Sequence, residues 1–184
     1  IAVRIIRACK EMGIKTVAVH STADADSLHV QYADEAICIG PSNKSESYLS
    51  LPNIISAADT TEADAIHPGT GFLAEAPHFA EACRDHNITF IGPTPENIEM
   101  MGDKAKARQI MAKAGLEPIP GSKGVVKDEK EAFKIARKFG YPVVVKSAAG
   151  GGGIGIREAH NDATLVNAFR LVQGESRSAF GRSD

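Results

Sequence analysis

Short apolar runs alternate with amphipathic stretches along the first half of the chain. The pattern predicts strands at residues 16–19, 36–39, 65–67 and 89–91, and helices at residues 1–12, 26–33, 47–61 and 73–86. Parallel neighbouring strands need long crossover connections, which helices usually supply. The alternation therefore predicts an α/β fold, with a Rossmann-like parallel sheet over residues 1–91 and helices on both of its faces.

The pattern changes after residue 91, where prolines and glycines become frequent. We interpret residues 92–118 as an ordered connector that contains one helix, predicted at 103–114. Beyond the connector, the pattern predicts a helix at 128–139, strands at 142–148 and 154–159, and a last helix at 161–180. Two strands joined by a glycine loop and flanked by helices predict a small α+β unit, which we place at residues 119–184.

Both ends of the chain lack elements that this pattern leads us to expect. The first residues already form a helical pattern, so we expect a strand and a turn before them. The last helix has no strand after it, which would leave the small α+β unit incomplete at its C-terminal end. We therefore expect the chain to be part of a longer protein.

Composition is that of an ordinary globular protein. Hydrophobic residues make up 43% and charged residues 24%, with a net charge of −2, so neither disorder nor a nucleic-acid partner is indicated. No apolar run approaches the roughly 20 residues of a membrane-spanning helix. We expect a cytoplasmic protein, or a mitochondrial matrix protein in a eukaryote. The histidines and cysteines lack the close spacing typical of metal sites, so no metal site is predicted.

The strongest candidate for a binding site is a lysine followed by a run of glycines. Lys146 ends a predicted apolar strand, and the glycines at 150–153 could present amide groups to an anion without obstruction by Cβ atoms. This combination suits a polyphosphate, although it is neither a Walker loop nor a dinucleotide-binding fingerprint. The alternative is a flexible hairpin turn in which Lys146 only extends into water. A run of glycines is entropically costly for a simple turn, which argues against that alternative.

A second candidate lies at the start of the helix predicted at 103–114. Asp103 can cap this helix, which places Lys104 in its first turn. A cation at the positive end of a helix dipole is slightly unfavourable, so an anionic ligand would explain its presence. Simple exposure of Lys104 to water explains it equally well. Met100 and Met101, just before the helix, are expected in the core.

A third candidate is the glycine-bearing turn over residues 66–75, at the carboxyl end of a predicted strand. Ligands of open α/β sheets bind at this edge. Taken alone, His67 fits a hydrogen-bonded core histidine better than a binding residue. Glu75 could simply stabilise the start of the following helix through its charge.

In their order and spacing, these segments closely resemble one family, the biotin carboxylases of acetyl-, propionyl- and methylcrotonyl-CoA carboxylases and of pyruvate carboxylase. The matching segments are residues 4–13, 15–21, 34–40, 65–75, 90–93, 101–104 and 140–153, and the resemblance covers essentially the whole chain. The lysine and glycine segment alone also fits the wider ATP-grasp superfamily, which includes carbamoyl phosphate synthetase. The His-Pro-Gly turn at 67–69, with the segments before it, is much more specific.

The resemblance implies that the chain binds ATP. Lys104 and Lys146 match lysines that contact nucleotide phosphates, Gly152 and Gly153 match glycines of the ATP-grasp lid that fold onto them, and Ile156 matches an apolar residue beside the adenine. By the same resemblance, residues 119–184 are most of that lid.

The resemblance also implies a homodimer, because Arg4, Arg7 and Glu11 match positions of the dimer contact. Two positions depart from the family. Thr70 stands where the family usually has a Tyr whose ring lies near bound biotin, and Ile154 stands where it usually has an Arg. The first change could loosen biotin binding, and the second removes a charge from a loop that handles phosphates.

The activity implied by the resemblance is the ATP-dependent carboxylation of biotin by bicarbonate, through carboxyphosphate. The Mg²⁺ ligands, the bicarbonate-holding residues and the catalytic base would lie beyond Asp184, so no catalytic residue is predicted in this chain, and we expect it to be inactive alone. The implied partners are a biotin carboxyl carrier domain or protein and a carboxyltransferase. The alternatives are a carbamoyl phosphate synthetase fragment and a non-catalytic nucleotide-binding module.

Overall fold

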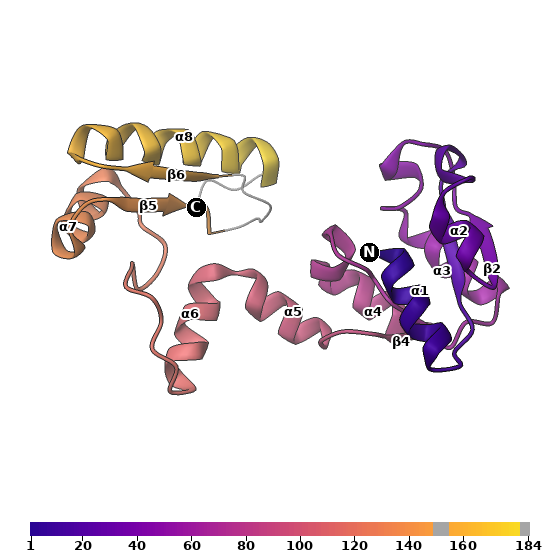
Figure 1. Cartoon of the computed structure of the whole chain (residues 1–184). Coiled ribbons are helices and arrows are strands. Elements are labelled where there is room, and N and C mark those ends of the chain that lie inside the picture. Colours follow the sequence, from indigo (N-terminus) through magenta and orange to yellow (C-terminus); the bar gives the residue numbers. More distant parts are fainter. Residues whose placement is uncertain (149–154, 181–184) are drawn as a thin grey trace. The chain divides into compact units, whose positions relative to one another are not determined.

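The computed structural model of the chain describes residues 1–148 and 155–180. The chain divides into two compact units, Ile1–Glu99 and Met100–Asp184, which we call the N-terminal and C-terminal units (Figure 1). Helix α5 (Pro95–Gly102) contains the boundary between them. Within the described residues, no helix is both long enough and apolar enough to cross a membrane.

The N-terminal unit alternates strands and helices, as the sequence pattern predicts. Its elements are α1 (Ala2–Glu11), β1 (Val17–His20), α2 (Leu28–Tyr32), β2 (Glu35–Cys38), α3 (Leu51–Thr60), β3 (Ala65–Ile66), α4 (Pro77–Asp85) and β4 (Thr89–Phe90). Strand β1 pairs in parallel with β2, and β3 pairs in parallel with β4. The prediction of an α/β fold with parallel strands is confirmed. Among the described residues, the strands of this unit form two separate pairs and not one continuous sheet.

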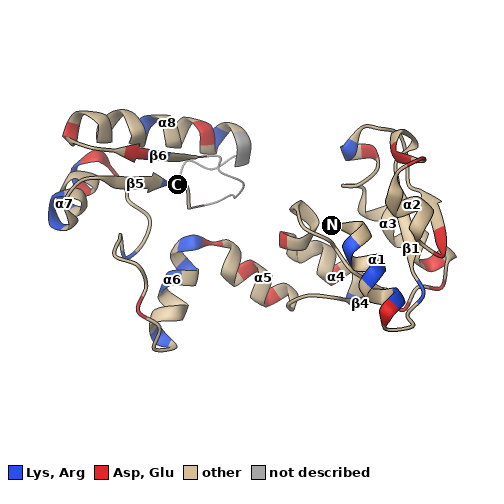
Figure 2. Ribbon diagram, viewed as in Figure 1, with Lys and Arg blue, Asp and Glu red and all other residues tan. Residues whose placement is uncertain are grey.

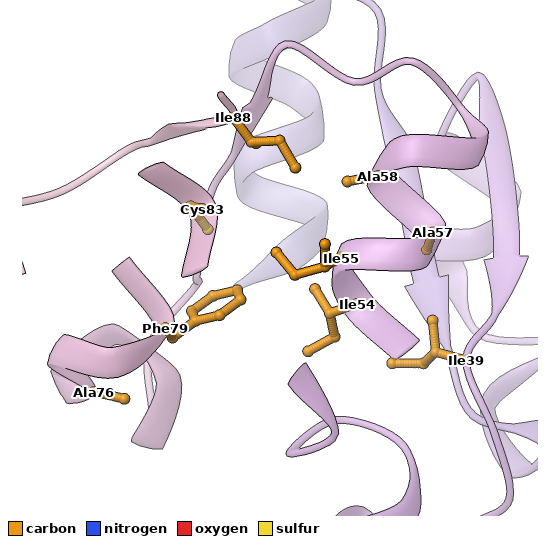
Figure 3. Packing of buried hydrophobic residues seen from close by; sticks show 9 residues of the cluster. All are labelled: Ile39, Ile54, Ile55, Ala57, Ala58, Ala76, Phe79, Cys83 and Ile88. Carbon is orange, nitrogen blue, oxygen red and sulfur yellow. The ribbon is translucent and has the colours of Figure 1, made fainter. Parts of the chain in front are cut away.

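The core of the N-terminal unit lies where α3 and α4 face each other and the strands. Figure 3 shows Ile54 and Ile55 of α3 directed toward Phe79 of α4. The Phe79 side chain is almost fully buried, and its ring meets the Phe90 ring edge to face at a centroid distance of 5.9 Å. The complete buried cluster is Ile39, Ile54, Ile55, Ala57, Ala58, Ala76, Phe79, Cys83 and Ile88.

Two of the predicted helices were wrong at their N-terminal ends, and a proline explains each difference. The helix predicted at 47–61 begins at Leu51 in the structure, with Pro52 in its first turn. The helix predicted at 73–86 is interrupted at Ala76, which separates a 3₁₀ turn over Phe72–Glu75 from α4. Proline lacks the N–H of an internal helical residue and favours an extended conformation in the residue before it, so a helix can start at proline but not continue through it.

Helix α5 lies in the segment interpreted as a connector, and the sequence patterns do not predict it. Pro95 occupies its first position, and the Thr94 hydroxyl accepts a hydrogen bond from the Asn97 amide at 3.4 Å. A capping threonine followed by proline is a recognised start signal for a helix. The signal was therefore present in the sequence, but the prolines around it suggested a loop.

The C-terminal unit builds an antiparallel hairpin covered by two helices. Its elements are α6 (Lys104–Lys113), α7 (Glu129–Phe139), β5 (Val143–Lys146), β6 (Ile156–Ala159) and α8 (Asp162–Phe180). Helices α7 and α8 pack on the hairpin through a core of four alanines, one leucine and one phenylalanine: Ala132, Ala136, Ala159, Leu165, Ala168 and Phe169. Val143 and Val145 of β5 also contact this core. The hairpin therefore has one face toward α7 and α8 and one face away from them.

Candidate nucleotide-binding site

The alternation of side chains along β5 places Lys146 on the hairpin face away from the core. Val143 and Val145 pack against the core, so Val144 and Lys146 project from the opposite face, because successive strand residues point to opposite sides. Lys146 is exposed, and Val144 is 54% exposed. This face therefore offers a cation beside open apolar surface.

Ile156 shares this face with Lys146. The two residues are directly paired across the antiparallel strands, and directly paired residues project from the same face. Ile156 is 37% exposed, and Glu158 pairs with Val144 one step further along the hairpin. An apolar side chain next to a lysine is an arrangement that can contact the base and the phosphates of a nucleotide at the same time.

The first turn of α6 approaches the same end of β5. Asp103 caps α6 as the sequence predicts, because its carboxylate accepts hydrogen bonds from the Ala105 and Lys106 amides, each at 3.0 Å. The Lys104 amide donates to the Ala148 carbonyl at 3.4 Å, two residues after Lys146. Lys104 and Lys146, which are 42 positions apart in the sequence, are therefore brought to one end of the hairpin. Figure 2 shows the basic residues of this unit, including those on α6.

The base of the hairpin requires a glycine at position 155. Gly155 has a φ of +69°, and a Cβ atom there would lie 3.0 Å from the Ser147 Cβ. The Ser147 amide donates to the Gly155 carbonyl at 2.9 Å, so the two strands stay joined one step beyond the paired residues Lys146 and Ile156. Gly152, Gly153 and Ile154 lie outside the described residues.

The third predicted motif lies in the N-terminal unit, at a cavity of about 360 Å³ that is lined in part by His67, Thr70 and Phe72. His67 is exposed, and its Nδ1 accepts a hydrogen bond from the Gly69 amide at 3.0 Å. The interpretation of His67 as a core histidine is therefore wrong, because its ring caps the turn instead. Thr70 is exposed on the same turn.

A hydrogen-bonded carboxylate lies beside this cavity. Tyr48, which lines it, donates its hydroxyl to Asp24 at 2.5 Å, and Ser21 donates to the same oxygen at 2.9 Å. Hydrogen bonds from Tyr48 and then Ser21 lower the pKa of Asp24, while burial and then Asp24 raise the pKa of Tyr48. These groups join β1 to the segment before α3 and stabilise that connection.

The candidate dimer residues share one side of α1. Arg4, Arg7 and Glu11 follow one another at spacings of three and four residues, which brings them to one face of a helix, and all three are exposed. The Arg7 guanidinium lies over the Tyr32 ring, 5.9 Å from its centroid. Because these three side chains are exposed in the N-terminal unit, this face is accessible to a partner chain.

Two features differ from, or go beyond, the sequence interpretation. Met100 and Met101, expected in the core, are 38% and 50% exposed. The sequence patterns did not indicate Glu175, which bonds to the start of β6 and pairs with Arg157. A helical glutamate surrounded by other polar residues gives no local signal of such a contact, which only the packing of α8 on the hairpin creates.

Comparison with known proteins gives two family matches. Residues 1–98 match the family described as biotin carboxylase, N-terminal domain, and residues 103–184 match the family described as carbamoyl-phosphate synthase L chain, ATP binding domain. Similar curated proteins include the biotin carboxylase of Nostoc sp. (strain PCC 7120), 55% identical over 183 residues, and biotin carboxylase 1 of Bacillus subtilis, 54% identical over 181 residues. The alignments cover 100% and 98% of this chain, but only 41% and 40% of those relatives.

Solved structures resemble the chain over its whole length. A biotin carboxylase from Campylobacter jejuni, described as a beta-gamma-ATP complex, gives a TM-score of 0.92 at 49% identity and covers 99% of this chain and 41% of its own. The biotin carboxylase domain dimer of Hydrogenobacter thermophilus 2-oxoglutarate carboxylase, in complex with ADP, its magnesium salt and bicarbonate, gives 0.91 at 49% identity, with 100% and 40% coverage.

Proposed function

Because this chain belongs to the biotin carboxylase family, we propose that it is the ATP-holding part of an enzyme that carboxylates biotin with bicarbonate. In this reaction bicarbonate attacks the terminal phosphate of ATP and displaces ADP, and the carboxyphosphate formed then breaks down to inorganic phosphate and CO₂, which a biotin nitrogen takes up. Phosphoryl transfer depends mainly on positioning and on neutralising the charge of the phosphate oxygens. The contribution of this chain is therefore to bind and orient the nucleotide.

One observation carries the proposal. The Lys104 amide bonds to the Ala148 carbonyl, which brings the first turn of α6 to the strand end where Lys146 is exposed beside Ile156. We assign Lys104 and Lys146 to the phosphates and Ile156 to the adenine. We also assign backbone contacts with the phosphates to Gly152 and Gly153, which lie outside the described residues.

The proposal extends to the organisation of the chain. We propose a Rossmann-like domain at residues 1–91, a connector at 92–118 and an ATP-grasp lid at 119–184. We also propose that Thr70 lies near bound biotin and that Arg4, Arg7 and Glu11 contribute to a homodimer contact. The proposed partners are a biotin carboxyl carrier domain or protein and a carboxyltransferase, in the cytoplasm or, in a eukaryote, in the mitochondrial matrix.

A second candidate function comes from the match of residues 103–184 to an ATP binding domain of carbamoyl-phosphate synthase. That match covers the lysine and glycine segment, which several ATP-dependent ligases could share. The match of residues 1–98 to the biotin carboxylase N-terminal domain favours biotin carboxylation. A biotin-dependent release of ADP by the full-length protein would separate the two functions.

No candidate site for Mg²⁺ is seen among the residues that the structure describes. None of their His, Cys, Asp and Glu side chains form a group of three or more that could hold a metal ion. We assign no catalytic step to this chain and predict that it binds nucleotide without turnover, because it spans only 41% and 40% of the length of the two relatives named above. Bicarbonate-dependent release of ADP from the purified chain, measured with a coupled assay, would contradict this prediction.

Titration of the chain with the fluorescent nucleotide mant-ATP tests the proposal. We expect saturable binding, weakened about tenfold or more by Lys146→Met, because the variant loses a charge-assisted contact with the phosphates. Lys134→Met is the matched control, since Lys134 is exposed on α7, an element assigned no contact with the nucleotide. Equal affinities of the two variants, or no binding by the unaltered chain, would refute the assignment.

A further inference from the structure

The two strands of the hairpin are both bonded to consecutive residues of α8 at the strand ends nearest to Lys146. We propose that Glu175 and Ser176 are positioning residues that hold Lys146 and Ile156 in the geometry that binds ATP. The inference rests on the nucleotide site proposed above and adds residues that do not lie on that face of the hairpin.

Glu175 holds the start of β6 at two points. One carboxylate oxygen accepts a hydrogen bond from the Gly155 amide at 3.2 Å, and the other pairs with the Arg157 guanidinium. The same guanidinium donates to the Ile156 carbonyl at 2.8 Å. Three successive residues of the chain, with Ile156 in the middle, are thus tied directly or through Arg157 to a single carboxylate.

Ser176 holds the end of β5. Its hydroxyl lies 2.8 Å from the Ser147 hydroxyl, and both side chains are buried, at 0% and 2% exposure. Ser147 directly follows Lys146, and its amide donates to the Gly155 carbonyl at 2.9 Å. Neighbouring residues of α8 therefore join both strands where the proposed ligand-binding residues sit.

The Arg157–Glu175 pair is better shielded from water than a comparable ion pair of the same helix. Its side chains are 42% and 32% exposed, whereas Arg170 and Glu129 of the pair that links α8 to α7 are 68% and 36% exposed. A more shielded pair is less weakened by solvent and salt. The Arg170–Glu129 pair joins α8 to α7 and offers a matched control.

The core can keep α8 on the hairpin without these contacts. Leu165, Ala168 and Phe169 of α8 belong to the buried cluster and lie one or more helical turns before Glu175. Loss of the Glu175 carboxylate should therefore disturb the strand ends locally and leave the unit folded. Because Glu175 projects toward the core side of β6 and Lys146 projects to the other face, its effect must pass through the backbone.

The experiment compares two probes on four forms of the full 184-residue chain: unaltered, Glu175→Ala, Glu175→Gln and the control Glu129→Ala. Mant-ATP reports phosphate and base contacts together, and mant-adenosine reports base contacts alone. We expect Glu175→Ala to weaken mant-ATP binding by about tenfold and mant-adenosine binding by a smaller factor, because mant-adenosine loses only the base contact of Ile156, whereas mant-ATP also loses the phosphate contact of Lys146. Glu129→Ala should leave both affinities unchanged.

Glu175→Gln keeps an acceptor oxygen for Gly155 and removes the charge that faces Arg157. We expect an intermediate loss of mant-ATP affinity. If Glu175→Ala does not fold, as judged by circular dichroism, Glu175→Gln tests the positioning role in its place. Unchanged mant-ATP affinity, or equal loss for both probes, would overturn the positioning role while leaving the nucleotide site intact. Failure of the unaltered chain to bind mant-ATP would instead refute the proposed function, and this inference with it.

Discussion

The two units of the chain differ in the side chains that fill their cores. The N-terminal unit buries large side chains, with four core isoleucines and Phe79 filling the space between α3, α4 and the strands. The C-terminal unit has four alanines in its core cluster, and side-chain bonds link its helices to its hairpin: Tyr141 with Asp162, Arg157 with Glu175, and Ser147 with Ser176.

The apolar core of the N-terminal unit contributes mainly stability, whereas the directional bonds of the C-terminal unit also fix the geometry of the ligand-binding residues. Apolar burial is favourable but non-directional, so it stabilises the N-terminal unit without specifying single atomic positions. Hydrogen bonds and ion pairs depend on distance and angle, and they occur around the hairpin that carries Lys146 and Ile156. A unit that must orient a nucleotide gains from contacts of this directional kind.

The largest effect is expected from emptying the core of the N-terminal unit. Phe79→Ala should destabilise this unit by about 3–5 kcal/mol, because it removes a ring that is 1% exposed and leaves a cavity. Hydrogen exchange followed by mass spectrometry should show faster exchange in α3 and α4, and no change in α8. The control Phe139→Ala, at a 44% exposed position of α7, should have little effect. Faster exchange throughout both units would contradict independent stabilisation.

A smaller effect is expected from overfilling the core of the C-terminal unit. Ala159 of β6 is fully buried in the core that the hairpin shares with α7 and α8, so Ala159→Leu should destabilise the unit by about 1–3 kcal/mol. Chemical denaturation followed by circular dichroism measures the change. Ala112→Leu, at an exposed position of α6, is the control and should be nearly neutral. Equal stability of the two variants would show that the alanine core is loosely packed.

The smallest effect concerns the bond network between α7 and α8. Hydrogen bonds from Arg137 and then Tyr141, each at 2.6 Å, lower the pKa of Asp162. A carboxyl group with a lowered folded-state pKa stabilises the fold above its ordinary pKa of about 3.9, and this stabilisation disappears as pH falls through the lowered value. Melting temperatures of the unaltered chain and of Asp162→Asn should therefore differ at neutral pH and converge in acid. A difference that does not depend on pH would contradict this reading.

The sequence predicted the elements with a strong local signal. Parallel strands in the first half, the hairpin near Lys146 and the cap at Asp103 follow from periodicity and residue type. The start of α3 and the interruption at Ala76 were missed, because the proline signals were outweighed by the helical periodicity around them.

The contacts that no sequence pattern predicts arise from tertiary packing. The bond from Lys104 to Ala148 and the contacts of Glu175 and Ser176 join segments that are 18 or more residues apart. The exposure of Lys146 and Ile156 on one face was predictable in principle, because the register of a hairpin determines which residues share a face. The motif lysines could therefore be named from the sequence, whereas the residues that support them could not.

Labelling with an acyl-phosphate derivative of ATP tests the central claim most directly, because this probe acylates lysine amines that lie beside the bound phosphates. Peptide mapping of the labelled chain should find the acyl group on Lys146 and Lys104, and excess ATP should prevent the modification. Lys134 and Lys138 of α7 should be labelled weakly, with no protection by ATP. Labelling of all four lysines to a similar extent, insensitive to ATP, would contradict the account.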